Sequence, residues 1–175
     1  MKSLVEKYVI KSPTGQWLAN IVLDDKDGDI YIQSDYGDYS YWWRSRGRDT
    51  TLKQFLLSCD DSYVMNKFGY GGKNDYFYAD RTIKNIKKDI LQQRREDRID
   101  SDQARLLWNE INDIDYSTDT CNEMYVSLAE WAPDVLSHIY GDSSYEIPWS
   151  TGTHPQLIAF MDKVWPLFLE EISNE

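Results

Sequence analysis

The sequence is short of the residues that build most metal sites and disulfide frameworks. It has two cysteines and two histidines in 175 residues. Cys59 and Cys121 lie far apart in the sequence and form neither a CxxC pair nor a spacing typical of a metal site. We therefore expect two separate thiols that behave as small hydrophobic side chains. We predict no metal and no cofactor.

A long uninterrupted hydrophobic run is also missing. The most apolar stretch, residues 157–169, is broken by Asp162, Lys163 and Pro166, which excludes a transmembrane helix. The first eleven residues alternate apolar and polar side chains and lack the continuous apolar segment of a signal peptide. We therefore expect a cytoplasmic protein that does not insert into a membrane.

Basic residues are almost absent from the second part of the chain. Residues 106–175 contain one, Lys163, against thirteen Asp and Glu. The first 105 residues carry 18 Lys and Arg and 17 Asp and Glu, so the net charge of −11 arises after residue 105. Such a charge attracts basic surfaces and opposes the approach of phosphates. Aromatic residues make up 14% of the chain, which distinguishes it from disordered acidic sequences.

The first 48 residues have the pattern of an antiparallel β-meander. Asp27-Gly28 is typical of a tight hairpin turn in which both central residues have positive φ. Residues 35–37 resemble a three-residue hairpin loop with Gly37 in the left-handed conformation. Short loops between successive strands indicate antiparallel pairing. Four strands are expected, over residues 4–11, 17–23, 30–34 and 39–43.

The second of these hairpins decides which side chains share a face of the sheet. If Ser34 faces Asp38, then Ile32 faces Ser40 and Ile30 faces Trp42. The opposite face then carries Tyr31, Tyr39, Tyr41 and Trp43. Both faces would be rich in apolar area, so we expect helices over at least part of each face, or a binding surface on one of them.

From residue 49 onward the hydrophobic period is that of helices. We expect five or six, with an interruption or restart at Pro133 and a kink at Pro166 in the last one. The predicted fold is α+β: a four-stranded antiparallel meander followed by helices that pack on it. We predict a single domain over residues 1–175, with a β-meander at 1–48, a helical part at 49–175 and acidic character from residue 106.

Two loops match ligand-binding motifs only in part. If Gly28 is the sixth residue of a calcium loop, the first is Leu23 and the twelfth is Ser34, and the flanks are strands. We therefore favour a solvated turn over a calcium site. Residues 69–74 lack the first glycine and the final Ser or Thr of a phosphate-binding loop, so we favour a connecting loop there.

His154 could form a hydrolytic triad with Ser150 and Asp162, but residues 150–155 suit the start of a helix equally well. We therefore assign no catalytic residues and predict that the protein is not an enzyme. A hydrolase around His154 remains an alternative.

A second alternative is binding of single-stranded nucleic acid on the sheet. Three aromatic residues followed by three arginines resemble a stacking platform with a basic rim. The other interpretation places these aromatics in the core under the helices, and the net charge favours it. The residues are Tyr39, Tyr41, Trp43, Arg44, Arg46 and Arg48.

The acidic part of the chain also has two interpretations. Its carboxylates could be the solvated faces of amphipathic helices. They could also form a surface for a basic partner, since spaced carboxylates on a folded scaffold can imitate the phosphates of DNA. The basic helix expected near residues 81–98 is either solvated or paired with this acidic part. The candidate partner-binding residues are Glu110, Asp113, Asp115, Asp119, Glu123, Glu130, Asp134, Asp142 and Glu146.

Several segments together resemble a family of small proteins encoded by bacteriophages and prophages. They are residues 34–43, 55–57, 63–67, 86–90 with Arg94-Arg95, Ala104-Arg105 with Trp108, and 160–165 with Pro166 and Phe168. The resemblance covers nearly the whole chain. It implies a phage accessory protein in a bacterial cytoplasm, and small acidic phage proteins are often inhibitors of host defence, including anti-restriction and anti-CRISPR proteins. We therefore expect binding to a host protein with a basic surface, and no direct binding to DNA.

Overall fold

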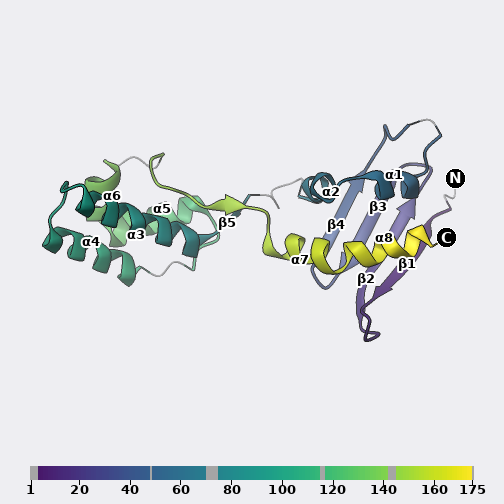
Figure 1. Ribbon diagram of the computed structural model, residues 1–175, viewed down its shortest axis with the longest axis horizontal. Helices are drawn as coiled ribbons and strands as arrows, with labels where there is room; N and C mark the ends of the chain where they lie inside the picture. The colour runs from purple at the N-terminus through teal and green to yellow at the C-terminus, as the bar shows by residue number, and fades with distance from the viewer. Residues whose placement is uncertain (1–3, 48, 70–74, 115–116, 142–144, 175) are drawn as a thin grey trace. The chain divides into compact units, whose positions relative to one another are not determined.

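A computed structural model describes residues 4–47, 49–69, 75–114, 117–141 and 145–174. The chain divides into two compact units (Figure 1). Each unit has its own hydrophobic core. The sheet unit consists of residues 1–74 and 153–175, and the helical unit consists of residues 75–152. We predicted a single domain over residues 1–175; in the structure the helical unit is an insertion between two segments of the sheet unit.

The sheet unit begins with the predicted meander. Four antiparallel strands lie in their sequence order, which confirms the α+β fold with a four-stranded antiparallel sheet at the N-terminus. The strands are β1 (Glu6–Lys11), β2 (Trp17–Asp24), β3 (Asp29–Ser34) and β4 (Gly37–Trp42).

The predicted register of the last hairpin is wrong by one residue. Gly37 has a φ of +109°, as expected for the left-handed position, but Ser34 pairs with Gly37 rather than with Asp38. Ile32 therefore pairs with Tyr39. A shift of one residue turns every side chain of a strand to the other face of the sheet, so the β4 tyrosines join the isoleucines of β3.

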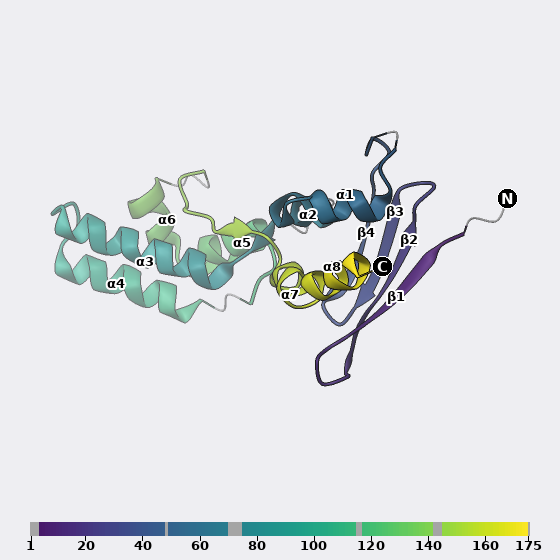
Figure 2. The same cartoon turned by 45° about the vertical axis from the view of Figure 1, so that its right-hand side comes forward.

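Four helices cover this apolar face (Figures 1 and 2). They are α1 (Leu52–Ser58), α2 (Asp61–Phe68), α7 (Pro155–Lys163) and α8 (Trp165–Ser173). Aromatic rings fill the space between sheet and helices: the centroid of the Phe160 ring lies 4.9 Å from that of Tyr39 and 6.0 Å from that of Phe68. Trp165 is also fully buried here. The core of the sheet unit therefore combines a cluster of aromatic rings with aliphatic side chains of the strands and helices.

The opposite face of the sheet has no helix of the sheet unit over it among the described residues (Figure 2). We call it the open face. Its side chains come from alternate positions of all four strands. They are Lys7 and Val9 of β1, Asn20 and Val22 of β2, Asp29, Tyr31 and Gln33 of β3, and Asp38, Ser40 and Trp42 of β4.

The described residues of the helical unit form four helices and a two-stranded ribbon. The ribbon pairs β5 (Tyr76–Phe77) with β6 (Thr151–Gly152), where the chain enters and leaves the unit. The core is aliphatic and includes Ile86, Ile111 and Leu128. The helices are α3 (Ala79–Arg95), α4 (Ser101–Asp113), α5 (Cys121–Trp131) and α6 (Pro133–Tyr140).

The described residues form eight helices, more than the five or six expected. Prolines account for part of the difference. Pro133 is the first residue of α6, the restart that the sequence analysis allowed. Pro166 does not kink one long helix as predicted; α7 ends at Lys163, and Pro166 lies in the first turn of α8. A proline is tolerated in a first turn because the N–H that it lacks has no partner there.

Candidate partner-binding surface

Most of the candidate acidic residues project from the helical unit into solvent. Glu123 and Glu130 are exposed on α5, and Asp134 is exposed in the first turn of α6. Asp113 is the exposed last residue of α4, and Asp119 and Glu146 are exposed in connections. Asp115 and Asp142 lie outside the described residues.

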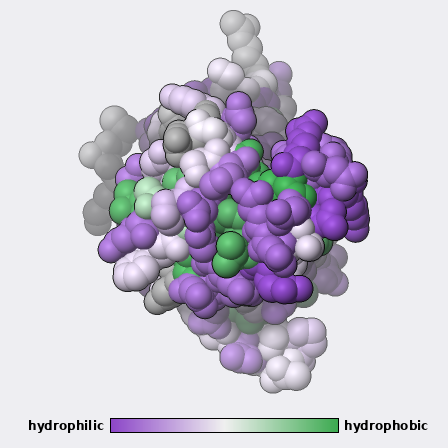
Figure 3. All heavy atoms as spheres, turned by 90° about the vertical axis from the view of Figure 1, so that its left-hand side faces the viewer, coloured by the Kyte–Doolittle hydropathy of each residue, from purple (hydrophilic) through white to green (hydrophobic). Residues whose placement is uncertain are grey.

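No ion pair neutralises these carboxylates among the residues that the structure describes. Among the described residues, the ion pairs farthest along the chain are Arg98 with Glu96 and Arg105 with Asp102. In the described chain no carboxylate after Asp102 lies within 4.0 Å of a Lys, Arg or His nitrogen. The face in Figure 3 is largely hydrophilic, with hydrophobic residues in small patches. The exposed carboxylates of the helical unit, here called the acidic surface, therefore have no Lys, Arg or His within ion-pair distance among the described residues.

The basic residues of α3 do not pair with this acidic surface. Lys87 Nζ donates to Asn112 Oδ1 at 2.6 Å and lies 5.2 Å from the centre of the Trp108 ring. Arg94 pairs with Asp97, three residues further along. The described contacts therefore favour the interpretation in which the basic face of α3 is solvated rather than paired with the acidic part of the chain.

Two of the acidic residues also stabilise the start of α5. Thr120 is the N-cap, and its Oγ1 accepts from the N–H of Glu123 at 3.1 Å. In return, Glu123 Oε2 accepts from the N–H of Asp119 at 3.1 Å. This arrangement resembles a capping box moved by one residue. Glu123 therefore has a structural role in addition to its exposed position.

Glu110 differs from the other candidates because it is half-buried in α4. Its Oε2 atom is fully enclosed and has no hydrogen-bond partner. Burial raises the pKa of Glu110, and the nearby carboxylate of Asp134 raises it further, although the backbone N–H of Val135 partly opposes the shift. Glu110 therefore faces the beginning of α6 rather than a partner.

We expect Glu110→Gln to stabilise the protein at neutral pH. A raised pKa means that the folded state binds the proton up to a higher pH than the unfolded state, so ionisation of Glu110 lowers stability as the pH rises. Removing the charge should give about 0.5 kcal/mol, the size of a like-charge contact on a helix. Urea unfolding should show a larger gain near pH 7 than near pH 4.5, about the usual pKa of Glu. Glu130→Gln is the control and should show no such difference, whereas a less stable Glu110→Gln at neutral pH would contradict the prediction.

Two of the three aromatic residues of the nucleic-acid alternative lie in the core of the sheet unit. Tyr39 and Trp43 are each 5% exposed, and Tyr41 is half-buried. Burial raises the pKa of Tyr39 to about 12. Trp43 Nε1 donates to the hydroxyl of Tyr63 at 3.1 Å. Because α1, α2 and α7 cover these rings, they do not form an open stacking platform.

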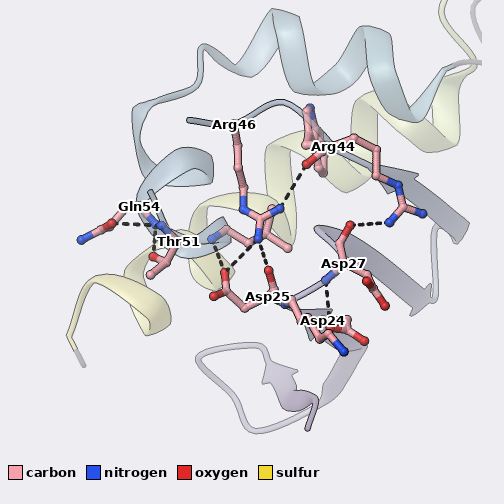
Figure 4. Close-up of polar contacts among 10 residues, drawn as sticks. Asp24, Asp25, Asp27, Arg44, Arg46, Thr51 and Gln54 are labelled. Carbon is pink, nitrogen blue, oxygen red and sulfur yellow. Dashed lines mark hydrogen bonds and ion pairs between the residues drawn. The ribbon is translucent and has the colours of Figure 1, made fainter. Parts of the chain in front are cut away.

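The arginines of the same alternative hold loops together instead of forming a basic rim (Figure 4). Arg46 donates from Nη1 to the carbonyl oxygen of Trp43 at 3.2 Å and from Nη2 to that of Asp25. Its guanidinium also lies 3.8 Å from the Asp25 carboxylate and is mostly buried. Arg44 donates to the carbonyl oxygen of Asp27 at 2.7 Å. Arg48 lies outside the described residues.

The aspartate-rich loop is a structural turn with four residues between β2 and β3. Asp24 Oδ1 accepts from the N–H groups of Lys26 and Asp27 at 3.1 and 3.2 Å (Figure 4). Gly28 has a φ of +75°, but Asp27 does not have positive φ, so the predicted two-residue turn is wrong. Asp25 Oδ1 accepts from the N–H of Leu52 at the start of α1, which ties this turn to the helix.

The remaining motifs are the histidine near the start of α7, the possible metal ligands and the glycine-rich loop. His154 is the N-cap of α7, and its Nδ1 accepts from the N–H of Gln156 at 3.1 Å. Ser150 belongs to the helical unit, whereas His154 and Asp162 belong to the sheet unit. Within the described ranges no group of three or more His, Cys, Asp or Glu could hold a metal ion. Residues 70–74 of the glycine-rich loop lie outside these ranges.

Comparison with known proteins places the chain in a family. A family model, Phage_phiTE_072, described as a phage family, matches residues 1–174. The chain belongs to this phage family. The match confirms the resemblance stated from the sequence segments. No match was found among curated proteins or among solved structures.

The structure of this phage protein adds one surface that sequence reasoning missed. Tyr31 and Trp42 are each 54% exposed on the open face, whereas the predicted register placed Tyr31 with Tyr39 and Trp42 with Ile30. Only the correct pairing of Ser34 with Gly37 separates the buried aromatics from the exposed ones. None of the described helices is long and apolar enough to cross a membrane.

Proposed function

We propose that this phage protein is a non-enzymatic binding protein whose acidic helical unit binds a basic surface of a host protein in the bacterial cytoplasm. One observation carries the proposal. Exposed carboxylates from α4, α5 and α6 have no Lys, Arg or His within ion-pair distance in the described part of the chain. Their mutual repulsion weakens the folded state, and cations supplied by a partner would relieve it.

Proteins that bind nucleic acid offer the basic surface that this proposal requires. Their Lys- and Arg-lined grooves are shaped for a regular series of negative charges. Carboxylates at Asp113, Glu123 and Glu130, held by rigid helices, can occupy such a groove and exclude DNA. We therefore propose inhibition of a host defence or nucleic-acid-handling protein, of the anti-restriction or anti-CRISPR type, by imitation of DNA.

Charge reversal on the helical unit should weaken binding to the host partner. The partner is first captured from host lysate on the immobilised protein and identified by mass spectrometry. Its affinity for the purified protein is then measured by calorimetry. Asp113→Lys with Glu130→Lys should lower the affinity roughly tenfold to a hundredfold. The affinity of the unmodified protein should also fall steeply between about 50 and 200 mM salt.

The matched control reverses two charges on the sheet unit. Glu170 and Glu171 are exposed on α8, so Glu170→Lys with Glu171→Lys makes the same change in net charge at another place. This control should bind as the unmodified protein does. Equal losses of affinity in both variants would show an effect of net charge alone. An affinity that does not depend on salt concentration would contradict binding through the acidic residues.

The same partner should separate DNA imitation from simpler acidic docking. If the protein occupies a nucleic-acid groove, duplex DNA competes with it for the partner. The protein itself should not shift a labelled oligonucleotide in a gel, because its carboxylates repel phosphates. Direct binding to the oligonucleotide would favour the nucleic-acid alternative instead.

A further inference from the structure

β1 is an edge strand whose outer side has no partner strand. It is the first strand of the sheet and pairs only with β2 among the described strands (Figure 2). The N–H of Asp35 donates to the carbonyl oxygen of Leu18 at 3.1 Å, and antiparallel strands alternate between hydrogen-bonded and non-hydrogen-bonded pairs. At every second residue from Leu18, the backbone of Asn20 and Val22 bonds to β3. The backbone of Ile21 therefore bonds to β1.

The outward backbone groups of β1 belong to Lys7 and Val9. Tyr8 pairs with Ile21, so the backbone of Tyr8 points to β2 and the residues on each side of it point away. No described residue outside β2 forms a hydrogen bond with the backbone of Lys7 or Val9. These outward N–H and C=O groups are a template on which another extended chain can pair. The chemistry of the edge thus specifies a polypeptide strand, which has donors and acceptors at the matching spacing.

A groove of about 360 Å³ lies at this edge, between β1 and α8. α8 packs on β1 through Phe168, whose ring centroid lies 5.5 Å from that of Tyr8. Three side chains of α8 line the groove: Leu167 is half-buried, and Glu170 and Glu171 are exposed. A strand added to β1 would therefore direct every second side chain toward α8.

The charges around the groove select the side chains of such a strand. Neither Glu170 nor Glu171 lies within 4.0 Å of a Lys, Arg or His nitrogen in the described chain. Lys11 also lines the groove, but it shares the open face with Lys7, because side chains alternate along a strand. The matching strand therefore has Lys or Arg on the side toward α8 and uncharged or acidic residues at the alternate positions.

A second copy of β1 is not this matching strand. Antiparallel pairing would keep its core-facing side chains toward α8, and these are Glu6, Tyr8 and Ile10. None of them is a cation, so a second copy would bring no positive charge to Glu170 and Glu171. The edge is thus better suited to a basic segment from elsewhere.

We propose that the groove between β1 and α8 binds an extended basic segment of another protein. The segment adds a strand to the sheet and hydrogen-bonds to the backbone of Lys7 and Val9. It directs Lys or Arg toward Glu170 and Glu171, and an apolar side chain on the same side packs on Leu167. In this mode of recognition the backbone pairing supplies affinity and the alternate side chains supply specificity.

Peptide binding to the full chain tests the groove. The probe is a labelled peptide in which Lys and Thr alternate, and its control has the same composition with all lysines in one block. Fluorescence anisotropy should give the alternating peptide an affinity about tenfold higher, because only this peptide directs its cations to one side of a strand. Equal affinities would overturn the proposal, since attraction by net charge alone does not depend on the order of residues.

A proline at position 9 tests the pairing through the backbone. Val9→Pro removes an outward N–H that the ladder with β2 does not use, and edge strands tolerate proline for this reason. The variant should bind the alternating peptide about tenfold more weakly. Val9→Thr keeps the N–H at the same position and should bind as the unmodified protein does. Circular dichroism verifies that both variants are folded, and equal affinities of the two folded variants would rule out pairing at this edge.

A second pair of variants tests the charge preference without altering the backbone of β1. Glu170→Gln with Glu171→Gln should lower the affinity for the alternating peptide about tenfold and reduce its dependence on salt. Glu130→Gln with Glu146→Gln makes the same change in charge on the helical unit and should leave the affinity unchanged. Equal losses in both variants would place the peptide outside the groove and overturn the proposal.

Sedimentation equilibrium of the unmodified protein and of Val9→Pro covers the remaining occupant of the edge. A dimer that Val9→Pro dissociates would assign the edge to a second copy of the chain and overturn the proposal. The result is separable from the proposed function, because Val9→Pro does not change the acidic surface. This variant should bind the host partner with the affinity of the unmodified protein.

Discussion

Replacing Phe160 with Ala lowers the free energy of unfolding of the sheet unit by about 4 kcal/mol. Phe160 is fully buried, and its ring centroid lies 4.9 Å from that of Tyr39 and 6.4 Å from that of Trp165. The substitution removes this ring from the centre of the aromatic core, and the rigid neighbouring rings close the cavity only in part. The expected loss is therefore near the upper end for a core substitution.

Hydrogen exchange read by mass spectrometry can locate this effect. Peptides from β1 to β4 should lose protection, while peptides from α3 to α6 keep theirs, because the two units have separate cores. Ile158→Ala is the control on the same helix, since Ile158 is 41% exposed, and should cost less than about 1 kcal/mol. Equal loss of protection in both units would contradict the separation of the cores.

Gly28→Ala should destabilise the protein by about 3 kcal/mol. Gly28 has a φ of +75°, a conformation that costs a residue with a side chain about 1 kcal/mol or more. A Cβ atom at this position would also lie 2.4 Å from Arg46 Nη1 and 2.5 Å from the carbonyl oxygen of Trp43. The second neighbour is backbone and cannot move aside as a flexible side chain does, so the contact between Arg46 and Trp43 is expected to break.

Gly15→Ala separates the backbone effect from the steric one. Gly15 has a similar φ of +85°, but a Cβ atom there would have no neighbour within 4 Å. It should therefore cost only about 1 kcal/mol. Urea unfolding of both variants under the same conditions gives the difference directly, and equal losses would mean that the arginine contacts around Gly28 contribute nothing.

Local features of the fold could be predicted from the sequence because they depend on nearby residues. The alternation of side chains gives the four strands to within a few residues, and Thr120 and Pro155 mark the starts of α5 and α7. At the start of α4 the sequence offers two neighbouring N-cap residues, Asp100 and Ser101, and the structure has Asp100 as the cap.

The register of β3 with β4 could not be predicted because two patterns were almost equally plausible. Residues 39–43 contain four aromatic side chains, so either face of β4 could belong to the core. Whether the loop has two residues, as between Ser34 and Gly37, or three depends on turn geometry. Tyr39 is buried because the rings of Phe68 and Phe160, which come from distant segments, pack on its ring. The sequence near Tyr39 does not indicate these contacts.

The division into two units was missed for a similar reason. An amphipathic helix has the same hydrophobic period whether its apolar side meets a sheet or another helix. The expectation that all helices pack on the sheet is therefore natural but unsupported by the pattern itself. In the structure Ile86, Ile111 and Leu128 belong to one core within the helical unit. The helices α7 and α8, near the C-terminal end of the chain, contribute to the core of the sheet unit.

The acidic surface was the more predictable part of the candidate site. A stretch without cations leaves its carboxylates without local partners, and the exposed positions of Asp113, Glu130 and Glu146 follow. Glu110 is the exception, because its place against the first turn of α6 depends on how α4 packs on that helix. Sequence spacing carries no information on this contact.

The ribbon of β5 and β6 pairs Phe77 with Thr151. The two ends of the helical unit therefore lie side by side. The sheet unit is interrupted between about residue 69 and residue 153. The helical unit is joined to it at only two points, which are adjacent. Loss, lengthening or replacement of the helical unit would leave the sheet unit with all its own contacts. A change confined to residues 75–152 is therefore expected to leave the fold of the sheet unit intact.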